Sequence, residues 1–192
     1  CVRVPVIGCI QLRERANHLC GWRHNGSALL AEKFVIMGVA GSGKSTVGEA
    51  LEEGLGWRYD DGDHLHPREN ILKMERGIPL TDEDRAPWLK LVGEELARHD
   101  GMIALGCSAL KRVYRAAIRQ SADTDVCFIY LAGSRELIEQ RMRARKGHFM
   151  PVTLLDSQFA ALEPPTGENA ISVDISGDLD SIIAQIKGGV SG

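Results

Sequence analysis

The residue pattern with the clearest chemical meaning is a glycine-rich stretch, GVAGSGKST, that begins at Gly38. It fits the spacing G-x-x-x-x-G-K-[ST], in which glycines let backbone N–H groups approach a polyphosphate. A helix that begins here adds partial positive charge for the same anion. Lys44 is expected to neutralise the β- and γ-phosphates, and Ser45 to ligate Mg²⁺. The stretch predicts that a nucleoside triphosphate is bound by Gly38, Val39, Ala40, Gly41, Ser42, Gly43, Lys44, Ser45 and Thr46.

Two carboxylates, Asp61 and Asp63, follow a short segment predicted as the second strand. Two residues apart at the end of a strand, both can point into one cleft. One can hold Mg²⁺ through water while the other accepts a hydrogen bond from a substrate hydroxyl. We assign Asp61 to the metal and Asp63 to the hydroxyl as base or orienting group, although the sequence also allows the reverse.

The nucleotide motif alone does not say what becomes of the γ-phosphate, so we compared classes of nucleotide-binding protein. A GTPase needs an N-K-x-D segment that reads the base, and the sequence contains none. A motor or AAA-type ATPase places an Asp at the end of a hydrophobic strand, but the candidate strand here ends in Leu105-Gly106-Cys107-Ser108. The chain length and the position of the acids favour a small-molecule kinase.

Short apolar segments alternate with helix-like segments from Phe34 onward, and this pattern positions the chemical residues. Apolar runs of this length between helices predict a buried parallel sheet with helices on both faces, an α/β fold. The expected strands are 34–37, 57–59, 102–105, 126–131 and 171–175. The expected helices are 45–55, 67–76, 81–99, 111–120, 134–146, 153–162 and 179–187.

Composition sets wider limits on the function. The 192 residues are 44% hydrophobic and 26% charged, which is typical of one globular domain, and the net charge of −3 argues against a nucleic-acid partner. No apolar run approaches the roughly 20 residues that span a bilayer, so no membrane association is expected. The 5 cysteines form no CxxC pair, which favours free thiols in a reducing compartment and a cytoplasmic location.

The first 31 residues differ from the rest of the chain. They carry four arginines and one acid, and they begin with Cys1 rather than Met. We expect residues 1–31 to be an extension that is disordered or an artefact of the start site, with an organelle-targeting peptide as the alternative. Residues 32–192 are expected to form the catalytic domain.

Several separate motifs follow one another along the chain: MGVAGSGKST, DGDHLHP, NxxKM, GIPLTDEDRAPWL, CSALKRVYR, FIYLAG, RARKGHFM and SQFAALEPP. Together they resemble those of the gluconokinases, ATP-dependent gluconate kinases of the shikimate kinase and nucleoside monophosphate kinase-like P-loop group. The resemblance implies a three-layer α/β/α P-loop kinase fold with a five-stranded parallel sheet, a mobile lid and a homodimer. It implies transfer of the ATP γ-phosphate to the 6-hydroxyl of D-gluconate, giving 6-phospho-D-gluconate and ADP. Ala40 is a small departure, since the family often has Ser there.

The resemblance directs attention to cations that could bind the gluconate carboxylate. Lys111 and Arg115 are four residues apart and are expected on one face of a helix that begins near Ser108. Arg85 could reach the same cleft. A solvated basic helix face is the alternative.

Two further assignments remain open at this point. His66 is expected to contact a substrate hydroxyl or to fix its loop by a hydrogen bond. Arg141 and Arg145 lie at the end of a predicted helix. They either interact with the helix dipole or are brought by the lid onto the transferring phosphate, as an arginine finger in cis.

Two other functions are compatible with the sequence. One is phosphorylation of another small hydroxy acid, such as shikimate. The other is nucleotide sensing by a non-catalytic P-loop module, which the acid pair and the two groups of cations disfavour.

Overall fold

The computed structural model describes residues 32–144 and 152–191 of the chain. The predictions made for residues 1–31 and for Arg145 concern residues outside these ranges.

Five strands form one sheet in which every neighbouring pair is parallel, as predicted. Their order across the sheet is β2-β3-β1-β4-β5, which places β1 at the centre. Phe34 and Ile36 of β1 face one side of the sheet, and Val35 and Met37 face the other; all four are at most 1% exposed. The strands are β1 (Lys33–Met37), β2 (Arg58–Asp61), β3 (Ile103–Gly106), β4 (Val126–Ala132) and β5 (Ala170–Asp174).

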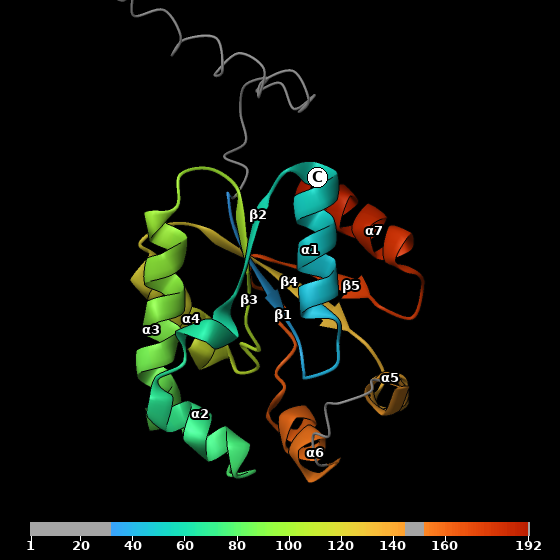
Figure 1. Ribbon diagram of the computed structural model, residues 1–192. Helices are drawn as coiled ribbons and strands as arrows, with labels where there is room; N and C mark the ends of the chain where they lie inside the picture. The colour runs from blue at the N-terminus through green and yellow to red at the C-terminus, as the bar shows by residue number, and fades with distance from the viewer. Residues whose placement is uncertain (1–31, 145–151, 192) are drawn as a thin grey trace, which may run out of the picture.

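Helices cover both faces of the sheet, which confirms the three-layer α/β/α architecture (Figure 1). Helices α1 and α7 lie together on one face, and α3 and α4 lie together on the other. Each pair closes a separate apolar layer against the sheet. The helices are α1 (Lys44–Leu55), α2 (Arg68–Glu75), α3 (Asp82–Arg98), α4 (Arg112–Ala122), α5 (Arg135–Ala144), α6 (Val152–Ala161) and α7 (Leu179–Ser191), with a short 3₁₀ turn, η2 (Gly62–Leu65), after β2.

The parallel arrangement brings the carboxyl ends of all five strands to one edge of the sheet, where ligands of open α/β sheets bind. There β1 leads into the glycine-rich stretch 38–46, which we call the phosphate loop, and β2 ends at Asp61. The amino ends of the strands, including Lys33 at the start of β1, lie at the opposite edge. The phosphate loop and Asp61 therefore lie at one edge of the sheet, and the start of β1 lies at the other.

Two helix starts show where local sequence signals succeed and fail. Thr81 and Asp84 form a reciprocal capping box at the start of α3, as their spacing predicts. The start of α4 is later than predicted, because Lys111 is its non-helical N-cap residue and not part of the helix. Ala109, just before it, has a positive φ of 41° that interrupts helical geometry.

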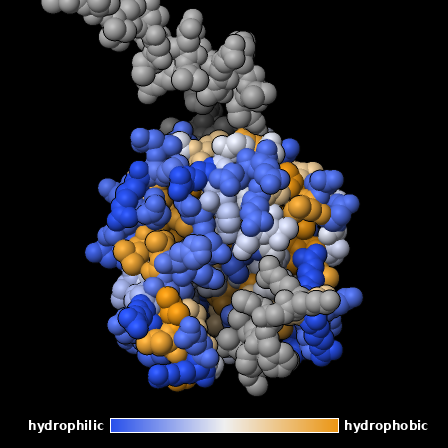
Figure 2. Space-filling view, in the orientation of Figure 1, coloured by the Kyte–Doolittle hydropathy of each residue, from blue (hydrophilic) through white to orange (hydrophobic). Residues whose placement is uncertain are grey.

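Large apolar side chains that remain exposed are concentrated on and just after α2. Ile71, Leu72, Met74 and Ile78 are each 39–47% exposed. The space-filling view shows a hydrophobic area at the lower left, over α2 (Figure 2). An apolar area of this kind on an otherwise polar surface is typical of an interaction site.

Candidate active site

The phosphate loop has the backbone geometry that anion binding requires. Gly41 and Gly43 have φ values of 79° and 97°, in a region that residues with a side chain rarely adopt. Gly43 is also the N-cap residue of α1, and no side chain caps that helix. The N–H groups of its first turn are therefore available to a phosphate. A Cβ at Gly41 would lie 2.6 Å from Cγ of Met142, so α5 covers the loop closely.

Lys44 lies across this loop, and its Nζ donates to the carbonyl oxygens of Gly38 and Val39, each at 3.2 Å. Burial lowers the pKa of Lys44, while the nearby Asp63 acts in the opposite direction. The hydroxyl of Ser42 is buried and has no hydrogen-bond partner within the described residues. Around Lys44 the loop thus offers a buried cation and an unpaired hydroxyl, which an anionic ligand would satisfy.

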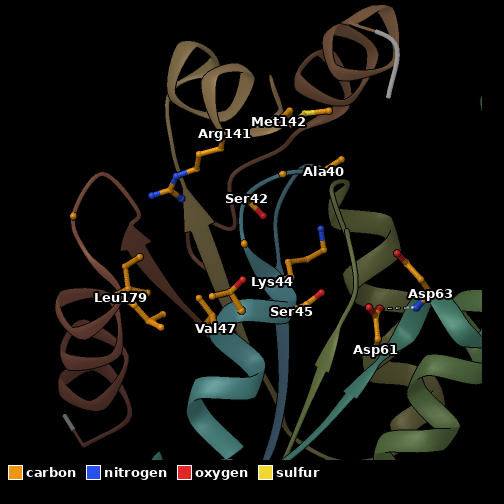
Figure 3. A pocket seen from close by; sticks show the side chains of 15 residues that line it. Ala40, Ser42, Lys44, Ser45, Val47, Asp61, Asp63, Arg141, Met142 and Leu179 are labelled. Atoms are coloured by element: carbon orange, nitrogen blue, oxygen red, sulfur yellow. Dashed lines mark hydrogen bonds between the residues drawn. The ribbon is translucent and has the colours of Figure 1, made fainter. Parts of the chain in front are cut away.

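The two predicted acids lie opposite the phosphate loop. Asp61 Oδ1 accepts the backbone N–H of Asp63 at 3.0 Å and thereby caps the turn η2. Figure 3 shows both carboxyl groups on the side of the pocket that faces Lys44 and Ser45. Partial desolvation by the cleft walls, and secondly the charge of Asp61, raise the pKa of Asp63. Its side chain is nevertheless 67% exposed and can be reached by a ligand.

One cavity of about 810 Å³ joins the phosphate loop, both acids and a second group of residues that the sequence did not reveal. That group comes from α5 and from the region after β5, so it extends the pocket away from the acids. The predicted fold did indicate that residues after β5 would lie near the site, because the loop that follows the last parallel strand begins at the same edge of the sheet. The residues of this second group that the sequence did not predict are Met142, Gly177, Leu179 and Ile182, and Val47 on α1 was not predicted either.

Arg141 lines this part of the cavity, as Figure 3 shows. Its Nη2 donates to the carbonyl oxygen of Ile175 at 2.6 Å, which ties α5 to the end of β5. The guanidinium therefore belongs to the pocket wall and has a partner beyond the dipole of its own helix.

His66 lies beside the acids, stacked on Trp88 with ring centroids 3.9 Å apart. Burial, and secondly the charge of Arg85, lower the pKa of His66 to about 4, so its ring is neutral at neutral pH. Its Nδ1 is buried without a hydrogen-bond partner in the described part of the chain. Its Nε2 is 4.0 Å from Asp63 Oδ1, too far for a hydrogen bond. The side chain of His66 therefore does not fix the loop in the predicted way.

Lys111 and Arg85 meet around the ring of Tyr114, where α3 and α4 begin. Lys111 Nζ lies 5.3 Å and the Arg85 guanidinium carbon 5.7 Å from the ring centroid. Lys111 Nζ also contacts both carboxylate oxygens of Asp82, at 2.8 and 2.9 Å. The two cations thus lie beside one aromatic ring, and both have partners: Lys111 pairs with Asp82, and Arg85 Nη1 donates to the carbonyl oxygens of Leu80 and Thr81.

Arg115 does not belong to this group, and the prediction that it shares a binding face with Lys111 is wrong. Its side chain is 1% exposed and bonds to Glu168, with Nη2 2.6 Å from Oε1. Its Nη1 donates to the carbonyl oxygens of Ala109 and Leu110 at 3.0 and 3.1 Å. Arg115 therefore uses its N–H donors inside the protein, where two of them stabilise the segment before α4. The backbone N–H of Arg112 at the start of α4 also has a partner, since it donates to Glu163 Oε2 at 2.7 Å.

Comparison with the sequences of known proteins shows the family to which the chain belongs. The probable gluconokinase of Xenopus tropicalis is 43% identical over 175 residues, which cover 82% of this chain and 92% of that protein. The gluconokinase of Gluconobacter oxydans (strain 621H) is 45% identical over 149 residues, 76% of this chain and 82% of that protein. The chain belongs to the gluconokinase family.

Structural comparison gives the same family assignment. A crystal structure of a gluconokinase from Sinorhizobium meliloti 1021 is 47% identical and superimposes with a TM-score of 0.78, covering 84% of this chain and 93% of that chain. A family model described as shikimate kinase matches residues 40–161. The chain is thus also similar in sequence to the shikimate kinases, and the match runs from Ala40 in the phosphate loop through both acids to the end of α6.

Proposed function

We propose that this gluconokinase-family chain transfers the γ-phosphate of ATP to the 6-hydroxyl of D-gluconate, giving 6-phospho-D-gluconate and ADP. The observation that carries the proposal is the single cavity in which Lys44 on the phosphate loop faces Asp61 and Asp63. The relatives named gluconokinase support the choice of acceptor.

The donor side of this reaction uses residues 38–46. The free N–H groups at the start of α1 fit the β- and γ-phosphates, and Lys44 would exchange its two carbonyl contacts for phosphate oxygens. The apolar residues Leu179 and Ile182 would hold the base and sugar of ATP. Arg141, and Arg145 if the lid brings it close, would stabilise charge on the transferring phosphate.

The residues also fit Mg²⁺ held jointly with phosphate. No set of three or more His, Cys, Asp or Glu side chains within residues 32–144 and 152–191 could hold a metal ion by itself. Ser45 and Asp61, the latter through water, would provide protein ligands beside phosphate oxygens, which suits an ion that retains several waters. When bound, Mg²⁺ would neutralise charge on the β- and γ-phosphates.

The acceptor side uses the residues around Asp63. Asp63 would orient the 6-hydroxyl and accept its proton as the oxygen forms a bond to the γ-phosphorus and the bond to the ADP oxygen breaks. The raised pKa of Asp63 favours this proton transfer. The unpaired Nδ1 of His66 would bond to another hydroxyl, while Lys111 and Arg85 would bind the carboxylate.

A substrate screen tests the proposal. Purified protein is incubated with ATP and Mg²⁺, and ADP formation is measured with D-gluconate, with shikimate, with other sugar acids or with no acceptor. Among these acceptors, we expect only D-gluconate to give rapid ADP formation. NMR of the product should show that the phosphate is attached at the 6-position. Faster turnover with shikimate would favour the other hydroxy-acid kinase, and nucleotide binding without turnover on any acceptor would favour a sensing module.

We further propose that the protein acts as a homodimer in the cytoplasm. The family resemblance supports the dimer, and the exposed apolar side chains of α2 provide one surface for it. None of the helices in the described ranges has the length and apolar character needed to cross a bilayer. Sedimentation equilibrium measures the oligomeric state, and a fluorescent fusion in cells reports the location.

A further inference from the structure

The phosphate loop has a contact outside its own strand and helix. The backbone N–H of Ala40, in the loop, donates to the side-chain oxygen Oε1 of Gln158 at 2.6 Å. Gln158 lies on α6 and is separated from Ala40 by 118 positions in the sequence. A contact across this distance is made by tertiary structure and not by the loop motif.

The helix that carries Gln158 is anchored in two places. Leu155 is 1% exposed and belongs to the apolar layer under α1 and α7, and Phe159 packs against the same layer. Just beyond α6, Glu163 joins the start of α4: its N–H donates to the Leu110 carbonyl at 2.9 Å, and its carboxylate accepts the Arg112 N–H. Gln158 therefore projects from a fixed support.

The chemistry of the contact explains why a glutamine suits this position. A backbone N–H that faces protein needs an acceptor, and the Ala40 side chain has no polar atom with which to brace the loop. The Gln158 amide provides that acceptor without the negative charge that would repel a bound phosphate. The amide orientation is also defined, because the reverse would place two donors together.

We propose that Gln158 is a positioning residue for phosphoryl transfer, which holds the phosphate loop at Ala40 in the conformation that receives the nucleotide phosphates. Without the contact, residues 39–41 can relax away from that conformation. Phosphoryl transfer depends on the alignment of donor and acceptor, so a small displacement of the loop reduces the rate. Acceptor binding involves other segments and stays unchanged.

Substitution of Gln158 by Met tests this inference, because Met keeps the length of the side chain and removes the acceptor. We expect kcat to fall and the dissociation constant of a non-hydrolysable ATP analogue to rise, each by about 5- to 10-fold, the range of one net hydrogen bond. The KM for gluconate should change by less than about twofold. Hydrogen exchange followed by NMR should show faster exchange of the Ala40 amide.

Two further variants make the test specific. Gln140→Met is the matched control, since Gln140 is an exposed glutamine on the neighbouring helix α5, and it should behave as the wild type. Gln158→Glu keeps an acceptor but adds charge; it should restore slow exchange at Ala40 while nucleotide affinity stays low.

The proposal fails if Gln158→Met retains wild-type kcat and nucleotide affinity, or if the Ala40 amide exchanges at the wild-type rate. An equal loss in Gln140→Met would also overturn it. If Gln158→Met does not fold, Gln158→Glu decides: rapid Ala40 exchange or wild-type nucleotide affinity in that folded variant contradicts the inference.

Discussion

Lys44 illustrates how single residues in this site are held ready for a ligand. Its ammonium group is buried against two carbonyl oxygens, and burial lowers its pKa. We expect Lys44→Ala to lower kcat by at least about 100-fold, the scale for losing one transition-state charge contact. Steady-state kinetics checks the loss, with Lys90→Ala on the exposed face of α3 as the control. Turnover near the wild-type level would contradict the assigned role of the phosphate loop.

Arg141 is assigned to the transferring phosphate and Lys111 to the gluconate carboxylate, so substitutions of the two residues should have different kinetic effects. An arginine that meets the phosphate as charge develops acts on the transition state, so Arg141→Ala should lower kcat far more than it raises the KM for gluconate. A carboxylate contact exists before and during transfer, so Lys111→Ala should mainly raise that KM. Kinetics on both variants, with melting curves, separates the two roles. Unchanged kcat with weaker gluconate binding in Arg141→Ala would refute this division.

The parts of the site that the sequence predicted are those encoded in short continuous motifs. Residues 38–46 and the pair Asp61 and Asp63 line one cavity because a local turn and a strand end fix their directions. Arg115 was assigned to the wrong environment because its direction depends on Glu168, 53 positions later. Gln158 was missed although it lies in the motif SQFAALEPP, because the motif gives no role to the glutamine and only tertiary structure brings it to Ala40.

At the scale of elements, a buried ionic cluster joins α4 to the segment before β5. Glu168 is 5% exposed and bonds to Arg115 and Arg119, which together lower its pKa to about 2 from a usual 4.5. Its contribution to stability is therefore complete above about pH 4.5 and is lost as the pH falls toward 2. The shift corresponds to about 3 kcal/mol.

We expect Glu168→Gln to lower the free energy of unfolding at neutral pH by about 3 to 5 kcal/mol, because Arg115 would remain buried without a counter-charge. The difference from the wild type should shrink as the pH falls from about 4.5 to about 2, because in this range the carboxylate is protonated in the unfolded state before it is protonated in the folded state. Denaturant unfolding across this pH range provides the measurement. Glu75→Gln, at the exposed end of α2, is the control and should show no such difference. A gap between Glu168→Gln and the wild type that does not vary with pH would contradict the account.

The elements themselves were largely predictable, because apolar runs and helix signals alternate regularly along the chain. The start of α4 was not, since no capping motif marks it. The positive φ of Ala109 and the contacts from Arg115 and Glu163 determine where that helix begins. Tertiary contacts thus override the local signal at the start of α4, which borders the acceptor side.

For the whole molecule, we propose that residues 32–192 are sufficient for folding and activity. All five strands and every assigned site residue lie within that range. Deletion of residues 1–31 should therefore leave the melting temperature and the gluconate kinase activity close to those of the full chain. Loss of soluble, folded protein on truncation would instead show that the extension contributes to the domain.

The opposite placement of the chain entry and the site has a practical consequence. The described chain enters β1 at Lys33, at the edge of the sheet away from the phosphate loop, and the loop follows only at the far end of that strand. A tag, a fluorescent reporter or a surface linker attached before Lys33 would lie on the side away from the pocket. The enzyme could then be immobilised or fused for use as a gluconate sensor while its pocket still faces the solution.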